Sequence, residues 1–399
     1  MLVANSPSGP VTGRRVAVTG LGAISCAGVG VDMLWNALLR PMAPSSKRIG
    51  EFDASHIGGV KELRRFDPFT LYALMAADEA WIQSGLEGPL IDAGSIVTTG
   101  IGGLQTVIEQ LRILNEKGPD RVSPFMVPMM MPNAATAAVS MRFGLGGPCE
   151  TVTTACAAGT HAIGNAARLV ATGRSTVAVA GGAEAVMVQI AEAGFRNMTA
   201  LSNEDFSRPF DIDRNGFVMG EGAGILILED WDHAVERGAT ILAEVLGAAS
   251  TADAHHITAP DPEGNGAVRC MELALADAGI SASDVSHINA HGTSTPLNDL
   301  AESVAVRRVF GDAAPPVTSI KGHLGHSLAA AGALEGVASV LTLQNQVIPP
   351  TAGTTVVDPE IALDVVIGAP RAAEVDVILS NSFGFGGHNG SVVFRRFRA

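Results

Sequence analysis

Short apolar runs alternate with longer stretches of helical periodicity along most of the chain. In the first part, apolar runs bounded by glycine or polar residues predict strands at residues 14–21, 95–99, 175–180 and 225–228, and helical spacing predicts helices at 33–39, 69–84 and 106–114. In the second part the same patterns predict strands at 243–250, 288–290, 316–320, 375–379 and 392–394, and helices at 266–278, 299–310 and 328–343. Residues 123–132, rich in proline and methionine, are expected to form a loop or lid. This alternation of strands and helices is typical of an α/β fold.

The stretch at residues 151–173 combines this pattern with candidate chemistry. Residues 152–155 read as the end of a buried strand, Cys156 lies at the turn, and small apolar residues continue at helical spacing to Gly173. A thiol at the first residue of a helix faces unpaired backbone N–H groups and the positive end of the helix dipole, which favour the thiolate near neutral pH. Two of those N–H groups are also placed to hold the oxyanion of an acyl transfer. A small buried core cysteine is the alternative interpretation, and this stretch alone does not decide between them.

A weak internal repeat divides the chain. Residues 152–173 and 317–343 both read as a strand, a polar turn and a helix rich in alanine and glycine. A chain of 399 residues is also too long for one ordinary core. We therefore expect a loose N-terminal tail at residues 1–13, followed by two similar halves at residues 14–242 and 243–399 that face each other.

Composition narrows the possible functions. Hydrophobic residues make up 47% of the chain and charged residues 17%, which allows a large buried core. The net charge of −14 argues against a nucleic-acid partner and against an anionic membrane surface. The cysteines show no metal-ligand spacing, and no signal peptide or membrane-spanning run is evident, so a reducing, cytoplasmic setting is expected. We expect no metal and no phosphate-binding or dinucleotide-binding loop.

Three side chains stand at turns between a strand and a helix, namely Cys156, His291 and His326. A lone histidine at a strand end is more often structural, but both of these lie in glycine-rich polar turns beside apolar strands. A basic interval at residues 47–67 is either a solvated surface or a docking site for an acidic partner. Its cations are Lys47, Arg48, Lys61, Arg64 and Arg65.

Four motifs occur in a characteristic order: TACAAG, NAHGTSTP, KGHLGHSLAAAGALE and NSFGFGGHN. Together they resemble the β-ketoacyl-acyl carrier protein synthases, and most closely the type II elongation enzymes of bacterial fatty-acid synthesis. The resemblance extends from about Arg14 to the C-terminus. It implies a thiolase-like fold, in which two duplicated halves form a five-layer α-β-α-β-α sandwich, and a homodimer.

The resemblance also implies the reaction, a decarboxylative Claisen condensation that lengthens an acyl chain by two carbons. Cys156 would accept the acyl group as a thioester, with the oxyanion held by the backbone N–H groups of Cys156 and Phe385. Neutral His291 and His326 would each donate an N–H to the enolate oxygen formed when malonyl carrier protein loses CO₂. No bound cofactor is implied, because phosphopantetheine arrives on the acyl carrier protein.

Further residues acquire expected roles from the same motifs. Lys321 matches a buried catalytic lysine whose charge is balanced by Glu335, Asp299 and Glu302. Substrate contacts are expected from Thr293, Thr295, Ile101, Phe383 and Phe385, and docking of an acidic carrier from Lys61, Arg64 and Arg65.

Two alternatives to a fatty-acid enzyme remain open. The catalytic ketosynthase subunit of a type II polyketide or specialised-metabolite pathway carries much the same motifs. An unrelated cysteine–histidine hydrolase would share the nucleophile and base but pass the acyl group to water.

Overall fold

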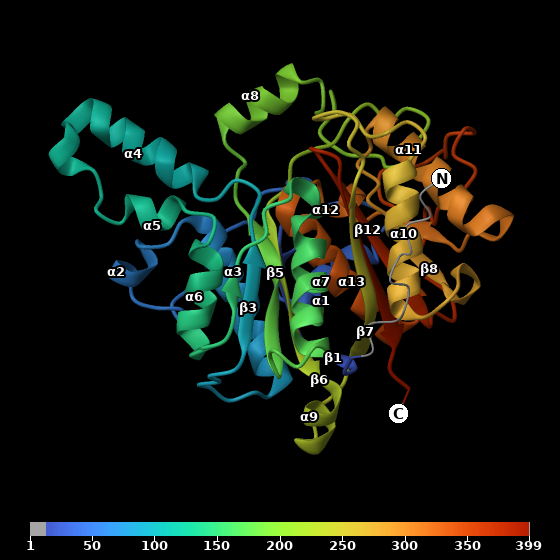
Figure 1. Ribbon diagram of the computed structural model, residues 1–399. Helices are drawn as coiled ribbons and strands as arrows, with labels where there is room; N and C mark the ends of the chain where they lie inside the picture. Colours follow the sequence, from blue (N-terminus) through green and yellow to red (C-terminus); the bar gives the residue numbers. More distant parts are fainter. Residues whose placement is uncertain (1–12, 399) are drawn as a thin grey trace, which may run out of the picture.

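The computed structural model of the chain describes residues 13–398 (Figure 1). The tail expected at residues 1–13 therefore lies outside the described residues, apart from Gly13. Within the described range, none of the helices is both long and apolar enough to cross a membrane.

Five strands form the sheet of the first half, in the order β4-β3-β5-β6-β1. β3 is parallel to β4 and β5, whereas β6 is antiparallel to β5 and β1. The short β2 (Gly28–Val29) pairs with the end of β1. The strands are β1 (Val16–Ser25), β3 (Gly94–Thr98), β4 (Cys149–Glu150), β5 (Val177–Glu184) and β6 (Gly222–Asp230).

The sheet of the second half has the order β7-β13-β12-β8-β9. β8 is parallel to β9 and β12, whereas β13 is antiparallel to β12 and β7. β1 and β7 pair through residues 16–18 and 243–245, so the two sheets are continuous. The strands are β7 (Ala243–Ala252), β8 (His287–Asn289), β9 (Val317–Thr318), β12 (Val377–Gly384) and β13 (His388–Arg396).

The two halves have the same topology. The five strands listed for each half can be numbered one to five in chain order. Moving outward from the β1–β7 junction, their order in the sheet is then one, five, four, two, three in both halves. The expected duplication is thereby confirmed. β7, the first strand of the second sheet, begins at Ala243.

Helices cover both faces of each sheet and complete five layers (Figure 1). α3 (Pro68–Ser84) and α6 (Ala134–Phe143) pack on the outer face of the first half, and α10 (Asn265–Ala278) and α11 (Pro296–Phe310) cover the outer face of the second. α7 (Ala158–Ala171) and α13 (Ala331–Asn345) lie between the sheets. The remaining elements are α1 (Val31–Leu38), α2 (Val60–Leu63), α4 (Leu104–Lys117), α5 (Met126–Met130), α8 (Gln189–Asn197), α9 (Trp231–Glu236), α12 (Lys321–Leu324), the pair β10 (Val347–Ile348) and β11 (Arg371–Ala372), and the 3₁₀ turns η1 (Pro119–Arg121), η2 (Ala155–Ala157), η3 (Ala282–Asp284), η4 (Gly311–Ala313) and η5 (Leu328–Ala330).

The two central helices, α7 and α13, pack against each other at glycine residues. A Cβ atom at Gly159 would lie 2.6 Å from the backbone nitrogen of Ala333, and one at Gly332 would lie 2.7 Å from that of Thr160. The absence of side chains at these positions lets the backbones of α7 and α13 approach closely. As a result, the turns that precede the two helices lie side by side.

Two secondary-structure predictions were wrong. Residues 152–155 do not continue a strand, because β4 ends at Glu150 and the hydroxyls of Thr151 and Thr153 donate to the carbonyls of Val97 and Thr99 instead. Residues 123–132, expected to form a loop or lid, instead contain the short helix α5 between flanking turns. The sequence pattern also did not reveal α6, α8 and α9.

The prediction that residues 47–67 are either a solvated or a docking surface fails at Lys47. This side chain is buried, and its Nζ donates to the carbonyls of Pro44 at 3.1 Å and His323 at 2.5 Å. Burial lowers the pKa of Lys47. Its carbonyl partners are provided by the tertiary fold, so charge pattern alone does not identify it as buried.

Candidate active site

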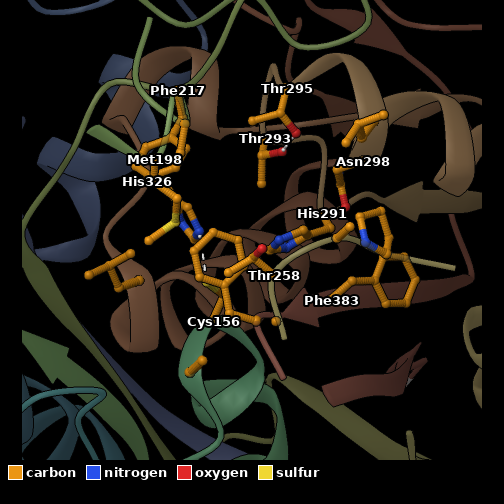
Figure 2. A pocket seen from close by; sticks show the side chains of 18 of the residues that line it. Cys156, Met198, Phe217, Thr258, His291, Thr293, Thr295, Asn298, His326 and Phe383 are labelled. Atoms are coloured by element: carbon orange, nitrogen blue, oxygen red, sulfur yellow. Dashed lines mark hydrogen bonds between the residues drawn. The ribbon is translucent and has the colours of Figure 1, made fainter. Parts of the chain in front are cut away.

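Three turns from different parts of the chain bring Cys156, His291 and His326 together (Figure 2). Cys156 lies in η2 just before α7, His291 lies two residues after the end of β8, and His326 lies between α12 and η5. One potential ligand atom of each lies within 4.8 Å of those of the other two, and Nε2 of His326 is 3.1 Å from Sγ of Cys156. The imidazole rings are 5.5 Å apart and nearly perpendicular. The strand-to-helix turns singled out in the sequence thus share one site.

The three side chains lie at a cavity of about 440 Å³ with mainly apolar walls. All five of the residues predicted to contact substrate line it, namely Ile101, Thr293, Thr295, Phe383 and Phe385. The hydroxyls of Thr293 and Thr295 are 2.9 Å apart. The cavity therefore offers polar contacts beside the threonines and an apolar surface for an aliphatic chain.

Sequence reasoning missed part of this lining. Phe217 packs edge-on against His326 with ring centroids 5.0 Å apart, and Phe195 and Met198 also line the cavity. These residues come from α8 and from loop segments around it, where no recognised motif marks them. Only their apolar character in otherwise polar segments was visible in the sequence.

Burial reverses the expected effect of the helix terminus on Cys156. The thiol is buried, which raises its pKa to about 11, although the charge of Lys321 and backbone N–H groups of Phe385 and Cys156 oppose this shift. The prediction of a free thiolate near neutral pH was therefore wrong, because desolvation outweighs the N–H groups and the dipole. Nε2 of His326 is close enough to accept the thiol proton during reaction.

Lys321 determines the tautomer of His291. Its Nζ lies 3.2 Å from Nδ1 of His291 and 2.6 Å from the carbonyl oxygen of the same residue. An ammonium group only donates hydrogen bonds, so Nδ1 accepts and the ring proton resides on Nε2. Burial, with the charge of Lys321, lowers the pKa of His291 and of His326 well below the ordinary value, so both rings are neutral.

Three buried carboxyl groups support the histidine turns in different ways. Glu335 pairs directly with Lys321. Glu302 instead accepts from the backbone N–H groups of His291 at 2.8 Å and Gly292 at 2.7 Å, and burial raises its pKa to about 8. Asp299 accepts from the N–H groups of Phe210 and Ser294. The charge of Lys321 opposes the rise in the pKa of Glu302, so Glu302 interacts with the lysine as well as holding backbone. The expectation that all three carboxylates balance the lysine charge needs correction for Asp299, whose charged neighbour is Arg214 instead.

The donor arrangement disfavours a metal ion. Among the described residues, Cys156, His291 and His326 form the only cluster with metal-ligand geometry. A metal at Nε2 of His291 would require the ring proton to move to Nδ1, where it would face the ammonium group of Lys321. This repulsion favours hydrogen-bond donation over metal coordination.

The predicted docking cations lie outside the cavity. Lys61 belongs to α2, and Lys61, Arg64 and Arg65 are all exposed. The guanidinium of Arg65 stacks over the ring of Phe125, with its central carbon 4.7 Å from the ring centroid. The site thus separates a buried reaction centre from an exposed basic surface.

Comparison with known proteins agrees with this geometry. Residues 41–234 match the beta-ketoacyl synthase N-terminal domain and residues 242–355 the C-terminal domain. The chain is 43% identical to 3-oxoacyl-(acyl-carrier-protein) synthase 2 of Rhizobium meliloti, with 96% of this chain and 99% of the relative covered. Among solved structures, the ishigamide ketosynthase/chain length factor superposes with a TM-score of 0.90 at 34% identity, covering 97% of this chain and 100% of the other.

A second solved structure is that of a type II PKS acyl-carrier protein in complex with its ketosynthase bound to the hexaketide. It has a TM-score of 0.88 at 31% identity and covers 96% of this chain and 100% of that one. The matches extend over both halves of the fold and over the turns that hold Cys156, His291 and His326. The chain belongs to the beta-ketoacyl synthase family and has its thiolase-like fold.

Proposed function

We propose that the protein condenses an acyl group held on Cys156 with malonyl-acyl carrier protein and so lengthens a fatty acyl chain by two carbons. The observation that carries this proposal is the meeting of one thiol with two neutral imidazoles at the wall of an apolar cavity. A hydrolase needs a nucleophile and one base, whereas two imidazole donors suit an enolate oxygen.

Acyl transfer begins with proton removal from the Cys156 thiol by Nε2 of His326, which lies 3.1 Å away. Sγ then attacks the thioester carbonyl, and the oxyanion accepts hydrogen bonds from the N–H groups of Cys156 and Phe385. Collapse of this intermediate breaks the bond to the carrier sulfur. The leaving thiolate takes the proton from His326, which returns to its neutral form.

Decarboxylation uses both imidazoles as donors. His326 returns from acyl transfer with its ring proton on Nδ1, so this proton first moves to Nε2 by tautomer exchange. The malonyl thioester oxygen then accepts Nε2–H bonds from His291 and His326 while the bond to the carboxylate breaks and CO₂ leaves. The electron pair of that bond forms the enolate. The enolate carbon then attacks the acyl-Cys156 carbonyl, and Sγ departs as the β-ketoacyl product forms.

An acyl carrier protein is the proposed partner. Its phosphopantetheine arm would pass the hydroxyls of Thr293 and Thr295, which line the cavity, and no further cofactor is required. The exposed Lys61, Arg64 and Arg65 suit the acidic surface of such a carrier. The ketosynthase of the similar PKS structure is in complex with an acyl-carrier protein.

We further propose a cytoplasmic homodimer. The edge strand β4 exposes both of its residues at one end of the sheet and offers unpaired backbone groups to a second copy. All four cysteines are free, as expected in a reducing compartment. Sedimentation of the purified protein tests the dimer, and a monomer at micromolar concentration would exclude it.

The decisive experiment supplies purified protein with an acyl carrier thioester and malonyl carrier protein. We expect CO₂ release and a β-ketoacyl product by mass spectrometry. Cys156→Ala should abolish acyl loading and condensation, and His291→Ala and His326→Ala should each slow decarboxylation by about 10²–10³. Hydrolysis of the acyl thioester without carbon–carbon bond formation would refute the proposal.

A polyketide ketosynthase is the second candidate, because one of the similar solved structures is a type II PKS ketosynthase bound to a hexaketide. The same assay separates the two. A fatty-acid enzyme releases its product after one condensation, whereas a polyketide enzyme adds several malonyl units without intervening reduction.

A further inference from the structure

Glu184 is a buried carboxylate behind the cavity wall and has no role in the chemistry above. It ends β5 and is fully buried. Its carboxylate accepts from the hydroxyl of Thr99 and the N–H of Gly100, both at 2.9 Å, and from the N–H of Ala329 at 3.4 Å. Thr99 and Gly100 belong to the first half of the chain and Ala329 to the second. The side chain therefore joins two walls that come from different halves.

Those two walls face the cavity. Gly100 and Ile101 line it on one side of this junction, and Leu328 lines it on the other, whereas Glu184 itself does not reach it. A Cβ atom at Gly100 would lie 2.8 Å from the carboxylate. The close packing of carboxylate and loop explains why a glycine stands at the cavity wall here.

The duplicated fold shows what Glu184 replaces. β5 and β12 are equivalent eight-residue strands, so Glu184 in the first half corresponds to Gly384 in the second. The turns η2 and η5 are equivalent too, and Ala155 and Leu328 share a left-handed φ of 48°. Ala329 therefore corresponds to Cys156.

Next to Gly384, the backbone N–H of Cys156 is the group that we assign to the oxyanion hole. A Cβ atom at Gly384 would lie 3.0 Å from the Cys156 nitrogen, so even a small side chain would crowd this N–H. In the first half, the equivalent N–H of Ala329 is occupied by the Glu184 carboxylate. Glu184 thus fills permanently the place that a substrate oxygen occupies transiently in the other half.

We propose that Glu184 is a positioning residue for acyl-chain binding: its carboxylate fills the first-half counterpart of the oxyanion hole and so fixes the Gly100–Ile101 and Leu328 walls against the incoming chain. This inference rests on the proposed condensing activity. Burial raises the pKa of Glu184 to about 7, while its hydrogen-bond donors oppose the shift. The hydrogen bonds, rather than a fixed charge, are therefore the property to test.

The test compares Glu184→Gln, Glu184→Ala and Thr99→Val. Glutamine keeps an oxygen for the two N–H groups and turns its NH₂ toward Thr99, whose hydroxyl oxygen accepts. We measure acyl loading of Cys156 from butyryl, octanoyl and myristoyl carrier proteins, together with malonyl decarboxylation. Glu184→Ala should lower kcat/KM for myristoyl loading about tenfold more than for butyryl loading, with decarboxylation within about twofold of the wild type. Glu184→Gln should retain the wild-type length profile, and Thr99→Val should shift it in the same direction as alanine but less.

Several outcomes overturn the assignment. A parallel loss of all three loading rates and of decarboxylation in Glu184→Ala means a merely structural role. A glutamine variant that behaves like alanine means that charge is what matters. Should the alanine variant not fold, an unchanged length profile in Thr99→Val overturns the proposal. Wild-type protein that does not condense at all refutes the proposed function instead, so the two failures are distinguishable.

Discussion

Nζ of Lys321 lies 3.2 Å from Nδ1 of His291, and the lysine is itself paired with buried Glu335. This contact places the ring proton of His291 on Nε2, where it faces the cavity. A residue that does not reach the substrate thus decides whether an imidazole donates to it. Forming the Lys321–Glu335 pair costs desolvation free energy, because both charges are almost completely buried.

Replacing Lys321 by methionine should therefore have two separable effects. The variant leaves Glu335 buried without its partner, which costs about 3–5 kcal/mol of stability. It also frees Nδ1 of His291 to carry the ring proton, so that Nε2 no longer always donates. The rate of decarboxylation should therefore fall at least about tenfold, and by at most about 10²–10³, the effect of losing one donor completely. Urea unfolding and the rate of CO₂ release measure the two effects.

The double variant Lys321→Met/Glu335→Gln is the matched control. It removes the unpaired carboxylate and should regain most of the stability, but its decarboxylation should stay slow. Recovery of the rate together with stability would show that Lys321 acts only through folding.

The raised pKa of Cys156 predicts slow alkylation at neutral pH. Since only the thiolate reacts and burial raises the pKa to about 11, the rate with iodoacetamide should rise about tenfold per pH unit between pH 7 and 10. Exposed Cys149 would react as well, so the measurement uses a Cys149→Ser background and mass spectrometry of the Cys156 peptide. A rate that levels off near pH 7 would mean that His326 already holds the thiol proton in the resting protein.

Local patterns and motif order predicted much of this structure. Strands β5 and β12 each begin with an apolar run, and the helices α7 and α13 are rich in small apolar residues, so both kinds of element could be predicted. Resemblance to a family then brought Cys156, His291 and His326 to one site. Periodicity alone does not do this, because the three residues belong to turns far apart along the chain.

Properties that depend on tertiary neighbours could not be predicted from the sequence. The burial of Lys47 depends on the carbonyl of His323, which lies far along the sequence. The pKa of the Cys156 thiol is higher than its place before a helix suggests, because burial in the folded protein desolvates it. Glu184 was visible only as a charge at the end of an apolar run, and its partner Ala329 comes from the other half.

Charge reversal at the exposed arginines tests carrier docking. Arg64→Glu/Arg65→Glu should raise KM for carrier-bound acyl substrates several-fold, because the variant repels an acidic partner, and should leave KM for small thioester mimics unchanged. The arginine effect should weaken as salt increases. Arg168→Glu/Arg174→Glu is the matched control, since it changes the same charge at exposed positions around the end of α7. Equal increases in KM for carrier-bound and small substrates would exclude docking at α2.

His287 offers a test of stability that leaves the reaction centre intact. It lies on β8, is buried, and neither ring nitrogen has a hydrogen-bond partner within residues 13–398. An unsatisfied buried polar side chain costs about 1–3 kcal/mol, so His287→Leu should be more stable than the wild type by about this amount at pH 7. Urea unfolding gives the difference directly.

The gain should grow in acid. Burial lowers the pKa of His287 to about 3, below the value of about 6.5 in an unfolded chain, so below pH 6.5 the unfolded state binds the extra proton. The free energy of unfolding of the wild type is therefore unaffected by this titration above pH 6.5. It decreases as the pH falls below that value, by about 2 kcal/mol at pH 5. Leucine has no such dependence, so the gap between the two proteins should widen by that amount. The exposed His255→Leu should alter stability by less than about 0.5 kcal/mol at either pH. A constant gap between pH 7 and pH 5 would mean that His287 finds a partner, such as a buried water molecule, and titrates normally.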